Sequence, residues 1–146
     1  NLTLLSDPVL LAGWGLTAKF CDTLRATVPR TVSVSPVNAD ELWEKRRLWF
    51  FKPARGHGSK AAYRGDKITR KVWADILAGD YVAQAFAAPS GRSVVIDGQS
   101  SALKVDIRLY TYAGEVLLTA ARLYQGQTTN MRTPGGGFAP VLERGA

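Results

Sequence analysis

Residues 50–65 read FFKPARGHGSKAAYRG and join a short apolar segment to a glycine-rich basic stretch. Pro53 has no backbone N–H to donate, so the apolar segment LWFFKP is expected to end there as a strand. The segment AAYRG predicts a returning strand, which gives a β-hairpin with glycines at its tip. Two interpretations of the tip stay open at this point: a basic turn on the surface, or a clamp for the phosphates of a nucleotide.

The positive charge of the chain is concentrated around this hairpin. The formal net charge of the 146 residues is +7. Between Glu44 and Lys71 there are ten Lys or Arg residues and two acidic residues, a balance of +8, so the rest of the chain sums to −1. A nucleic-acid-coating protein usually spreads its charge along a face or a tail, whereas a patch beside glycines indicates a compact anion. A solvated run of charge is the alternative.

Composition places the chain among ordinary globular domains. Its length suits one domain, and 46% hydrophobic with 21% charged residues is typical of a soluble protein. No apolar run approaches the roughly 18 residues of a membrane span, and the start does not resemble a secretory signal. The single cysteine, Cys21, excludes an internal disulfide, and we expect a cytoplasmic protein. Because the chain starts at Asn1 and ends in VLERGA, we also expect it to be part of a longer polypeptide.

Helical and strand patterns alternate along the chain, so the expected fold class is α+β with mostly antiparallel sheets and flanking helices. The expected helices are 7–13, 17–27, 38 or 40 to 46, and 69–78. The expected strands outside the hairpin are 30–36, 81–86, 103–112 and 115–124, the last two joined by a turn at Ala113-Gly114. The segments PSGRS and DGQSS are expected to be turns.

Several common sites are excluded by residue type or spacing. The stretch Gly56-His57-Gly58-Ser59-Lys60 has the ingredients of a P-loop at the wrong spacing, and no GxGxxG follows a strand. One histidine and one cysteine cannot build a zinc site from those ligands. His57 is therefore expected to shape or line the loop rather than to act as a base.

Polar residues at strand ends and glycine loops form the remaining candidate site. Lys52 stands at a strand end, where its stem can pack on the sheet while its charge meets a phosphate. The loop Gly56–Gly65 offers backbone N–H groups to an anion, and the strand Tyr81–Gln84 would present edge backbone groups to adenine. Asp106 and Arg108 share one strand face, on which a surface ion pair is the alternative interpretation.

In this order the motifs resemble the ATP-grasp superfamily, in particular its circularly permuted bacterial branch related to glutathionylspermidine synthetase. LLAGWGLTAKFCDTLRATVPRT is similar to the helical lead-in of that family, and FFKPARGHGSKAAYRG to its lysine-proline strand and glycine loop. YVAQ resembles the hinge strand that meets adenine. DIRLYTYAGEVLLTAARLYQGQTTNMRTPGGG resembles the Asp-x-Arg strand, the later arginine and the asparagine before paired glycines.

The resemblance implies an ATP-dependent ligase that joins a carboxylate to an amine through an acylphosphate, with ATP and Mg²⁺ as cofactors. It implies that Arg108 and Arg122 neutralise charge on the acceptor or the transferring phosphoryl group. The nucleotide-binding residues that it implies are Lys52, Gly56, His57, Gly58, Ser59, Lys60, Tyr81, Val82, Gln84, Asp106 and Asn130.

The chain departs from the family at the metal site. Thr128-Thr129-Asn130 stands where the family has a Glu-x-Asn strand, so the Mg²⁺ ligands are expected outside this chain and none is assigned within it. We therefore expect a C-terminal ATP-grasp-like portion of a ligase that is inactive alone, with subdomains 1–102 and 103–146. Its partners would be ATP, a carboxylate or amine substrate and the rest of the polypeptide. A vestigial nucleotide-binding module is the first alternative, and a nucleic-acid-binding domain with Trp49, Phe50 and Tyr63 as stacking groups is the less favoured one.

Overall fold

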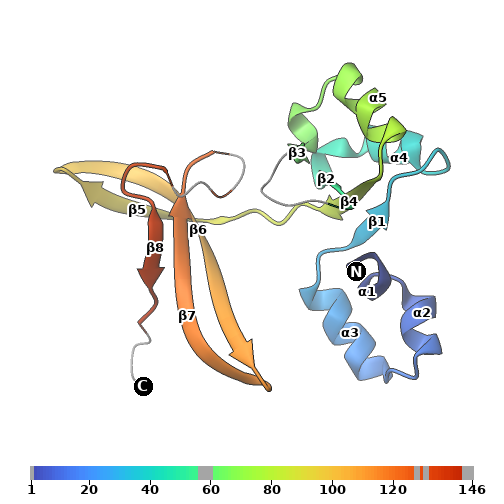
Figure 1. Cartoon of the computed structure of the whole chain (residues 1–146), viewed down its shortest axis with the longest axis horizontal. Helices are drawn as coiled ribbons and strands as arrows, with labels where there is room; N and C mark the ends of the chain where they lie inside the picture. Colours follow the sequence, from blue (N-terminus) through green and yellow to red (C-terminus); the bar gives the residue numbers. More distant parts are fainter. Residues whose placement is uncertain (1, 56–60, 127–128, 130–131, 143–146) are drawn as a thin grey trace. The chain divides into compact units, whose positions relative to one another are not determined.

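The computed structural model describes residues 2–55, 61–126, 129 and 132–142. The chain forms two compact units, Asn1–Ala87 and Ala88–Ala146, and each contains one antiparallel four-stranded sheet (Figure 1). The expected α+β class is confirmed. The boundary between the units precedes the expected one at 102/103, which falls within a strand of the second unit.

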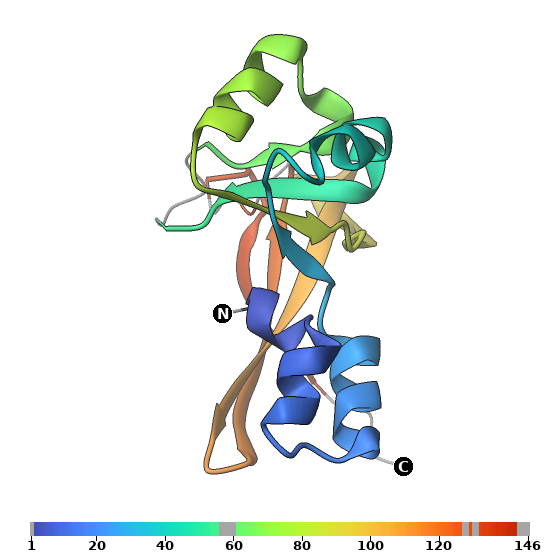
Figure 2. The same cartoon turned by 90° about the vertical axis from the view of Figure 1, so that its right-hand side faces the viewer.

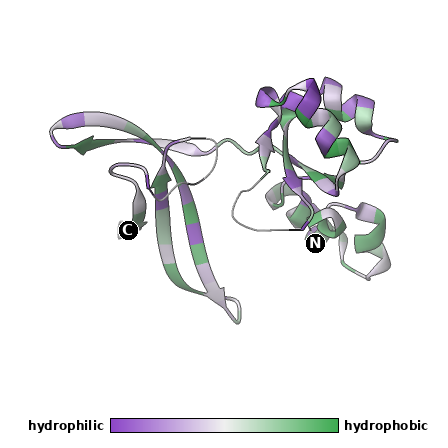
Figure 3. Ribbon diagram, turned by 45° about the horizontal axis from the view of Figure 1, so that its top comes forward, coloured by the Kyte–Doolittle hydropathy of each residue, from purple (hydrophilic) through white to green (hydrophobic). Residues whose placement is uncertain are grey.

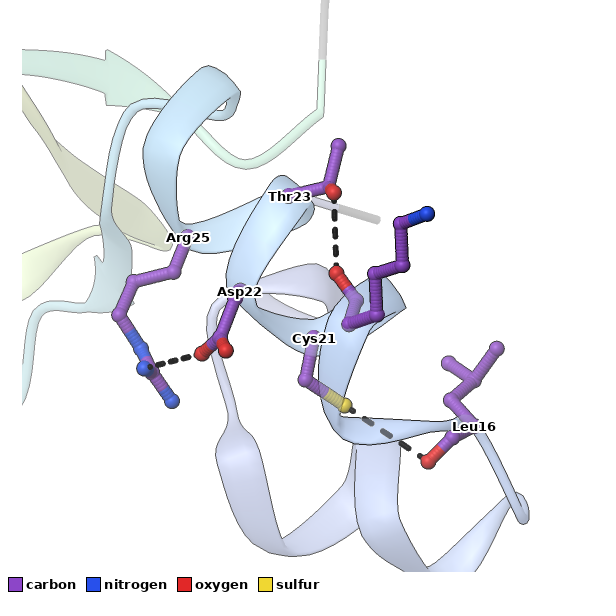
Figure 4. A network of polar contacts seen from close by, with 6 residues as sticks. Leu16, Cys21, Asp22, Thr23 and Arg25 are labelled. Atoms are coloured by element: carbon purple, nitrogen blue, oxygen red, sulfur yellow. Dashed lines mark hydrogen bonds and ion pairs between the residues drawn. The ribbon is translucent and has the colours of Figure 1, made fainter.

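Three short helices open the first unit: α1 (Leu2–Leu5), α2 (Pro8–Gly13) and α3 (Ala18–Thr27). The Asp7 carboxylate accepts hydrogen bonds from the first turn of α2, at 2.9 Å from the nitrogen of Val9, which explains why this helix begins where predicted. Thr17 caps α3 in the same way. Within α3, Arg25 pairs with Asp22, and Cys21 lies near the Leu16 carbonyl (Figure 4).

The first sheet has the order β1-β4-β2-β3, so β4 lies inside it. Its strands are β1 (Thr31–Ser33), β2 (Trp49–Pro53), β3 (Tyr63–Arg64) and β4 (Tyr81–Ala85). Strands β2 and β3 pair antiparallel through Phe50–Arg64 and Phe51–Tyr63, as the hairpin prediction requires.

Two helices, α4 (Ala39–Glu44) and α5 (Arg70–Ala78), pack on one face of this sheet, on the side away from α1–α3 (Figure 2). Two 3₁₀ turns, η1 (Arg46–Leu48) and η2 (Gly65–Lys67), flank β2 and β3. Phe51 and Ile76 are fully buried, and the Phe51 ring meets Trp73 edge-on at 5.3 Å between centroids. The other members of this core are Leu42, Trp49, Ile68 and Ala83.

The second unit contains β5 (Ser90–Ile96), β6 (Gln99–Tyr112), β7 (Glu115–Tyr124) and β8 (Gly137–Pro140), in that order across the sheet. The turns at Asp97-Gly98 and Ala113-Gly114 have positive φ at both residues, which suits two-residue hairpins. The prediction of a turn at PSGRS was wrong, since most of it lies in β5, where Ser90 pairs with Val105. Strand β8 was not predicted, because it lies in a tail rich in turn residues and follows a run of glycines that resembles a loop.

Beyond their pairing with β5 and β8, β6 and β7 continue as a two-stranded ribbon with exposed apolar residues along both strands (Figure 3). The exposed apolar residues on this ribbon are Ile107, Leu109, Tyr110, Tyr112, Val116, Leu117 and Leu118. None of the helices in the described residues is long and apolar enough to cross a bilayer.

Candidate functional site

The face of the first sheet opposite α4 and α5 carries the central part of the predicted site. Side chains alternate between the two faces of a strand, and the paired residues of neighbouring strands share a face. Because Phe51 and Ala83 point into the core beneath α5, Phe50, Lys52, Val82 and Gln84 lie on the opposite face. All four are half-buried. The structure therefore brings together three residues of the prediction, Lys52, Val82 and Gln84, and adds Phe50.

A chain of side-chain hydrogen bonds crosses this face from β2 to β1. The Lys52 Nζ donates to Oε1 of Gln84 at 2.5 Å. The Nε2 of Gln84 donates to Oγ1 of Thr31 at 3.1 Å, and that hydroxyl donates to the Pro29 carbonyl at 2.9 Å. Thr31 is 4% exposed, so its hydroxyl has little access to water. Lys52 thus donates to the neutral amide of Gln84, and that amide in turn donates to Thr31.

The Lys52 ammonium lies in an environment that suits an anionic ligand. Burial lowers the pKa of Lys52 below its usual value. Among the described residues, no carboxylate forms an ion pair with it. The Phe50 ring, with its centroid 5.5 Å from Nζ, is the other close partner. An approaching phosphate would supply the negative charge that these neighbours do not.

Tyr81 does not join this group. It pairs with Pro53 and lies on the core side of the sheet, where its ring stacks on Tyr63 at 6.5 Å between centroids. Burial raises the pKa of the Tyr81 hydroxyl, with smaller contributions from Tyr63 and from the charge of Asp75. This side chain therefore serves the packing of the hairpin, away from the face that carries Lys52.

The backbone of β4 is also placed differently from the expectation. Strands β1 and β2 pair with it on its two sides, so the strand has no open edge to offer an adenine ring. Pairing continues at its end, where the Ala85 and Phe86 N–H groups donate to the carbonyls of Arg30 and Leu48. The sequence prediction failed here because the order of strands in a sheet depends on long-range pairing rather than on local pattern.

The glycine loop follows directly on the Lys52 strand. Five predicted residues of this loop, Gly56 to Lys60, lie outside the described residues. Its ends are fixed by the pairing of β2 with β3. After β3, Gly65 is buried against η1, where an added Cβ would lie 1.7 Å from the Arg46 carbonyl oxygen. Only glycine fits this approach.

Part of the basic patch has a packing role. The guanidinium groups of Arg46 and Arg70 lie 4.3 and 4.1 Å from the centroid of the Trp43 ring. Arg64 lies 4.5 Å from the Phe86 ring and pairs with Asp66. The local charge therefore stabilises this unit as well as making its surface positive. Lys52, on the sheet face opposite α4 and α5, donates instead to the neutral side-chain amide of Gln84.

In the second unit, Asp106 and Arg122 form a bidentate pair across β6 and β7. The Nε and Nη2 of Arg122 donate to the two carboxylate oxygens at 2.6 and 2.7 Å. The Thr129 hydroxyl adds a hydrogen bond of 3.2 Å. Burial opposes ionisation of Asp106, but the hydrogen bonds and charge of Arg122, with Thr129 and Arg108, outweigh it and lower the pKa of this carboxyl.

This pairing bears on the predicted roles of Arg108 and Arg122 in neutralising phosphoryl charge. Arg122 already has a full carboxylate partner, so it has less charge to offer a phosphoryl group than the prediction assumed. Arg108 lies opposite Ala120 and is exposed, which leaves its guanidinium accessible. Asn130 lies outside the described residues. The structure thus joins Asp106 to Arg122 and leaves Arg108 at the surface beside them.

The described residues contain no cluster of three or more His, Cys, Asp or Glu side chains that could hold a metal ion. Asp106, the carboxylate among the predicted site residues, is already bound by Arg122. These residues do not fit the Mg²⁺ that the family resemblance implies.

A scan against protein-family models and a search of curated proteins both give no match to this chain. Sequence reasoning missed Thr31 as a member of the site. Its only signal was its place at the start of an expected strand, and the contact with Gln84 spans 53 positions of sequence.

Proposed function

We propose that this chain provides the ATP-binding portion of an ATP-dependent carboxylate–amine ligase. The observation that supports this most directly is Lys52, a half-buried ammonium on the sheet face opposite α4 and α5, whose hydrogen-bond partner is a neutral amide. A glycine-rich basic segment follows four residues later. A lysine and glycine backbone amides together form a common phosphate-binding combination.

The apolar neighbours of Lys52 suit the rest of a nucleotide. Phe50 and Val82 flank it on the same face and are half-buried, so they offer apolar surface to a base or ribose. The backbone of β4 is paired and takes no part in this proposal. In the proposed reaction a carboxylate oxygen attacks the γ-phosphorus of ATP, ADP leaves, and an amine then displaces phosphate from the acylphosphate.

A vestigial nucleotide-binding module is the alternative that two observations favour. Arg122 is paired with Asp106, and the carboxylates of the described residues form no metal-binding group. Such a module would bind ATP through Lys52 and release no phosphate. The nucleic-acid alternative has less support, because Trp49 is 9% exposed and belongs to the core, so it has no free ring face for a base.

The proposal is tested by limited trypsin digestion of the full chain with and without ATP. Arg55 and Lys60 provide cleavage sites in the glycine loop, and ATP is expected to protect them in the wild type but not in Lys52→Ala. Lys19→Ala, which alters an exposed lysine on α3, is the matched control and should keep the protection. Equal protection of Lys52→Ala by ATP would show that Lys52 is not a phosphate ligand.

Two further measurements separate the alternatives. Phosphate release that requires an added amine acceptor would identify an active ligase, whereas ATP binding without release would favour the vestigial module. Tight binding to oligonucleotides that weakens steeply with salt, and is indifferent to ATP, would favour the nucleic-acid alternative.

A further inference from the structure

We propose that Thr31 is a positioning residue for Lys52, acting through the side-chain amide of Gln84. The inference deepens the proposed ATP site and rests on it for its functional meaning. Its structural basis is the set of hydrogen bonds that joins β2, β4 and β1 on the face of the first sheet opposite α4 and α5.

The direction of each hydrogen bond follows from donor and acceptor chemistry. The Thr31 hydroxyl has a single proton, which it donates to the Pro29 carbonyl at 2.9 Å. Toward Gln84 that hydroxyl must therefore accept, so the amide NH₂ faces Thr31 at 3.1 Å. The amide oxygen is then left on the other side, where Lys52 lies 2.5 Å away.

The opposite orientation of the Gln84 amide loses two interactions at once. Its NH₂ would face the Lys52 ammonium, and two donors cannot bond each other. Its oxygen would face a Thr31 hydroxyl whose proton is already directed at Pro29. Thr31 thus selects the amide orientation that holds the lysine.

The backbone of Thr31 is itself held by a hydrogen bond to Ser6. Its backbone N–H donates to the Ser6 hydroxyl at 2.9 Å, and that hydroxyl donates to the Leu2 carbonyl at 2.8 Å. Thr31 also pairs with Gln84 in the sheet register and is 4% exposed. The Lys52 ammonium is therefore connected through Gln84, Thr31 and Ser6 to the helix α1 of the same unit.

The neutral amide has a consequence for the ligand. A carboxylate at position 84 would bind the lysine as an ion pair, but it has no N–H to donate to Thr31, and it would cancel the charge of the lysine and repel phosphate. Gln84 binds the ammonium without cancelling its charge and without repelling phosphate. The site therefore favours a ligand that brings its own negative charge, and the triphosphate of ATP meets that requirement.

The test compares three variants of the full chain in two assays. Thr31→Val keeps the shape but removes the hydroxyl, Thr31→Ser restores the hydroxyl, and Gln84→Glu replaces the amide by a carboxylate. The first assay is trace acetylation of ligand-free protein with acetic anhydride, which measures the rate at Lys52 relative to exposed Lys19 by mass spectrometry. The second is ATP affinity by titration calorimetry, with circular dichroism as the check on folding.

In Thr31→Val the relative acetylation rate at Lys52 should rise about threefold and ATP affinity should fall about fivefold, as expected for the loss of one positioning hydrogen bond. Thr31→Ser should stay within about twofold of wild type in both assays. Gln84→Glu should slow acetylation of Lys52 through the new ion pair and still weaken ATP binding.

An unchanged Lys52 rate in folded Thr31→Val, or an equal rise in Thr31→Ser, would overturn the positioning role of Thr31. If the wild type binds no ATP, the proposed function fails, while the acetylation rates still decide whether Thr31 positions Lys52. If Gln84→Glu binds ATP as well as wild type, the uncompensated charge of Lys52 does not bind the triphosphate.

Discussion

Asp106 and Arg122 lie directly opposite each other on β6 and β7, and two hydrogen bonds of 2.6 and 2.7 Å join them. Their side chains are 29% and 19% exposed, so water screens the pair only partly. Since the two residues are neighbours across the centre of the sheet, the pair connects the long hairpin to the segment that carries Thr129. We expect it to stabilise the second unit rather than to act on a substrate.

Replacing Asp106 by Asn should therefore lower the free energy of unfolding by about 1–2 kcal/mol at neutral pH, because the charge-assisted hydrogen bonds are lost. Urea denaturation of the wild type and of Asp106→Asn measures this difference. A variant with unchanged stability would show that the pair contributes nothing net, as many exposed pairs do.

The same pair predicts how stability depends on pH. The pKa of Asp106 is lowered in the folded state from its usual value of 3.8, so the unfolded chain binds the proton more readily. The contribution is full above the unfolded pKa and is lost as pH falls through the lower folded pKa. The difference between wild type and Asp106→Asn in urea midpoints should therefore shrink below pH 3.8.

Lys52 predicts a pH dependence of the same sign, but at alkaline pH. Its folded pKa is lowered by burial, so the unfolded chain again binds more protons, now at alkaline pH. Wild-type stability should rise as pH increases through that lowered pKa toward the usual 10.5. Lys52→Met keeps the apolar stem and should lack this rise, and denaturant midpoints measured across this pH range test it. An identical alkaline profile would contradict the burial of the charge.

Gly65→Ala should severely destabilise the first unit. The new Cβ would lie 1.7 Å from the Arg46 carbonyl oxygen and 2.8 Å from that of Trp49, so the backbone must move, and we expect a loss of more than about 2 kcal/mol. Gly13→Ala is the matched control, since an added Cβ there meets nothing within 4 Å at the end of a helix. Thermal melts that show equal shifts for both variants would disprove the close approach.

Phe51→Ala should cost about 3–5 kcal/mol, because the ring is 0% exposed and packs against Trp73. The same substitution at Phe20, which is 62% exposed on α3, should cost less than about 1 kcal/mol. Tryptophan fluorescence that changes less on unfolding in Phe51→Ala, but not in Phe20→Ala, would place the effect in this core. Similar costs at the two positions would contradict the burial of Phe51.

Local sequence patterns were sufficient for most of the helices and for both predicted hairpins. Asp7 and Thr17 are capping residues at the predicted helix starts, and Gly79 follows the last residue of α5. Pro53 is the last residue of β2 as expected. These features depend on neighbouring residues, which a sequence displays directly. Strand β5 was mistaken for a turn because Ser90, Gly91 and Arg92 pair with β6 rather than following a local preference.

The sequence by itself determined the α+β class, the β2–β3 hairpin and the placement of Lys52 at a strand end. Only the tertiary structure decided that β4 is an inner strand, that Tyr81 turns to the core and that Arg122 is bound by Asp106. It also brought Thr31 to Gln84 across 53 positions. The physical reason is that helix caps, turns and side-chain alternation act over a few residues, whereas strand order and cross-strand hydrogen bonds join residues that no short pattern connects.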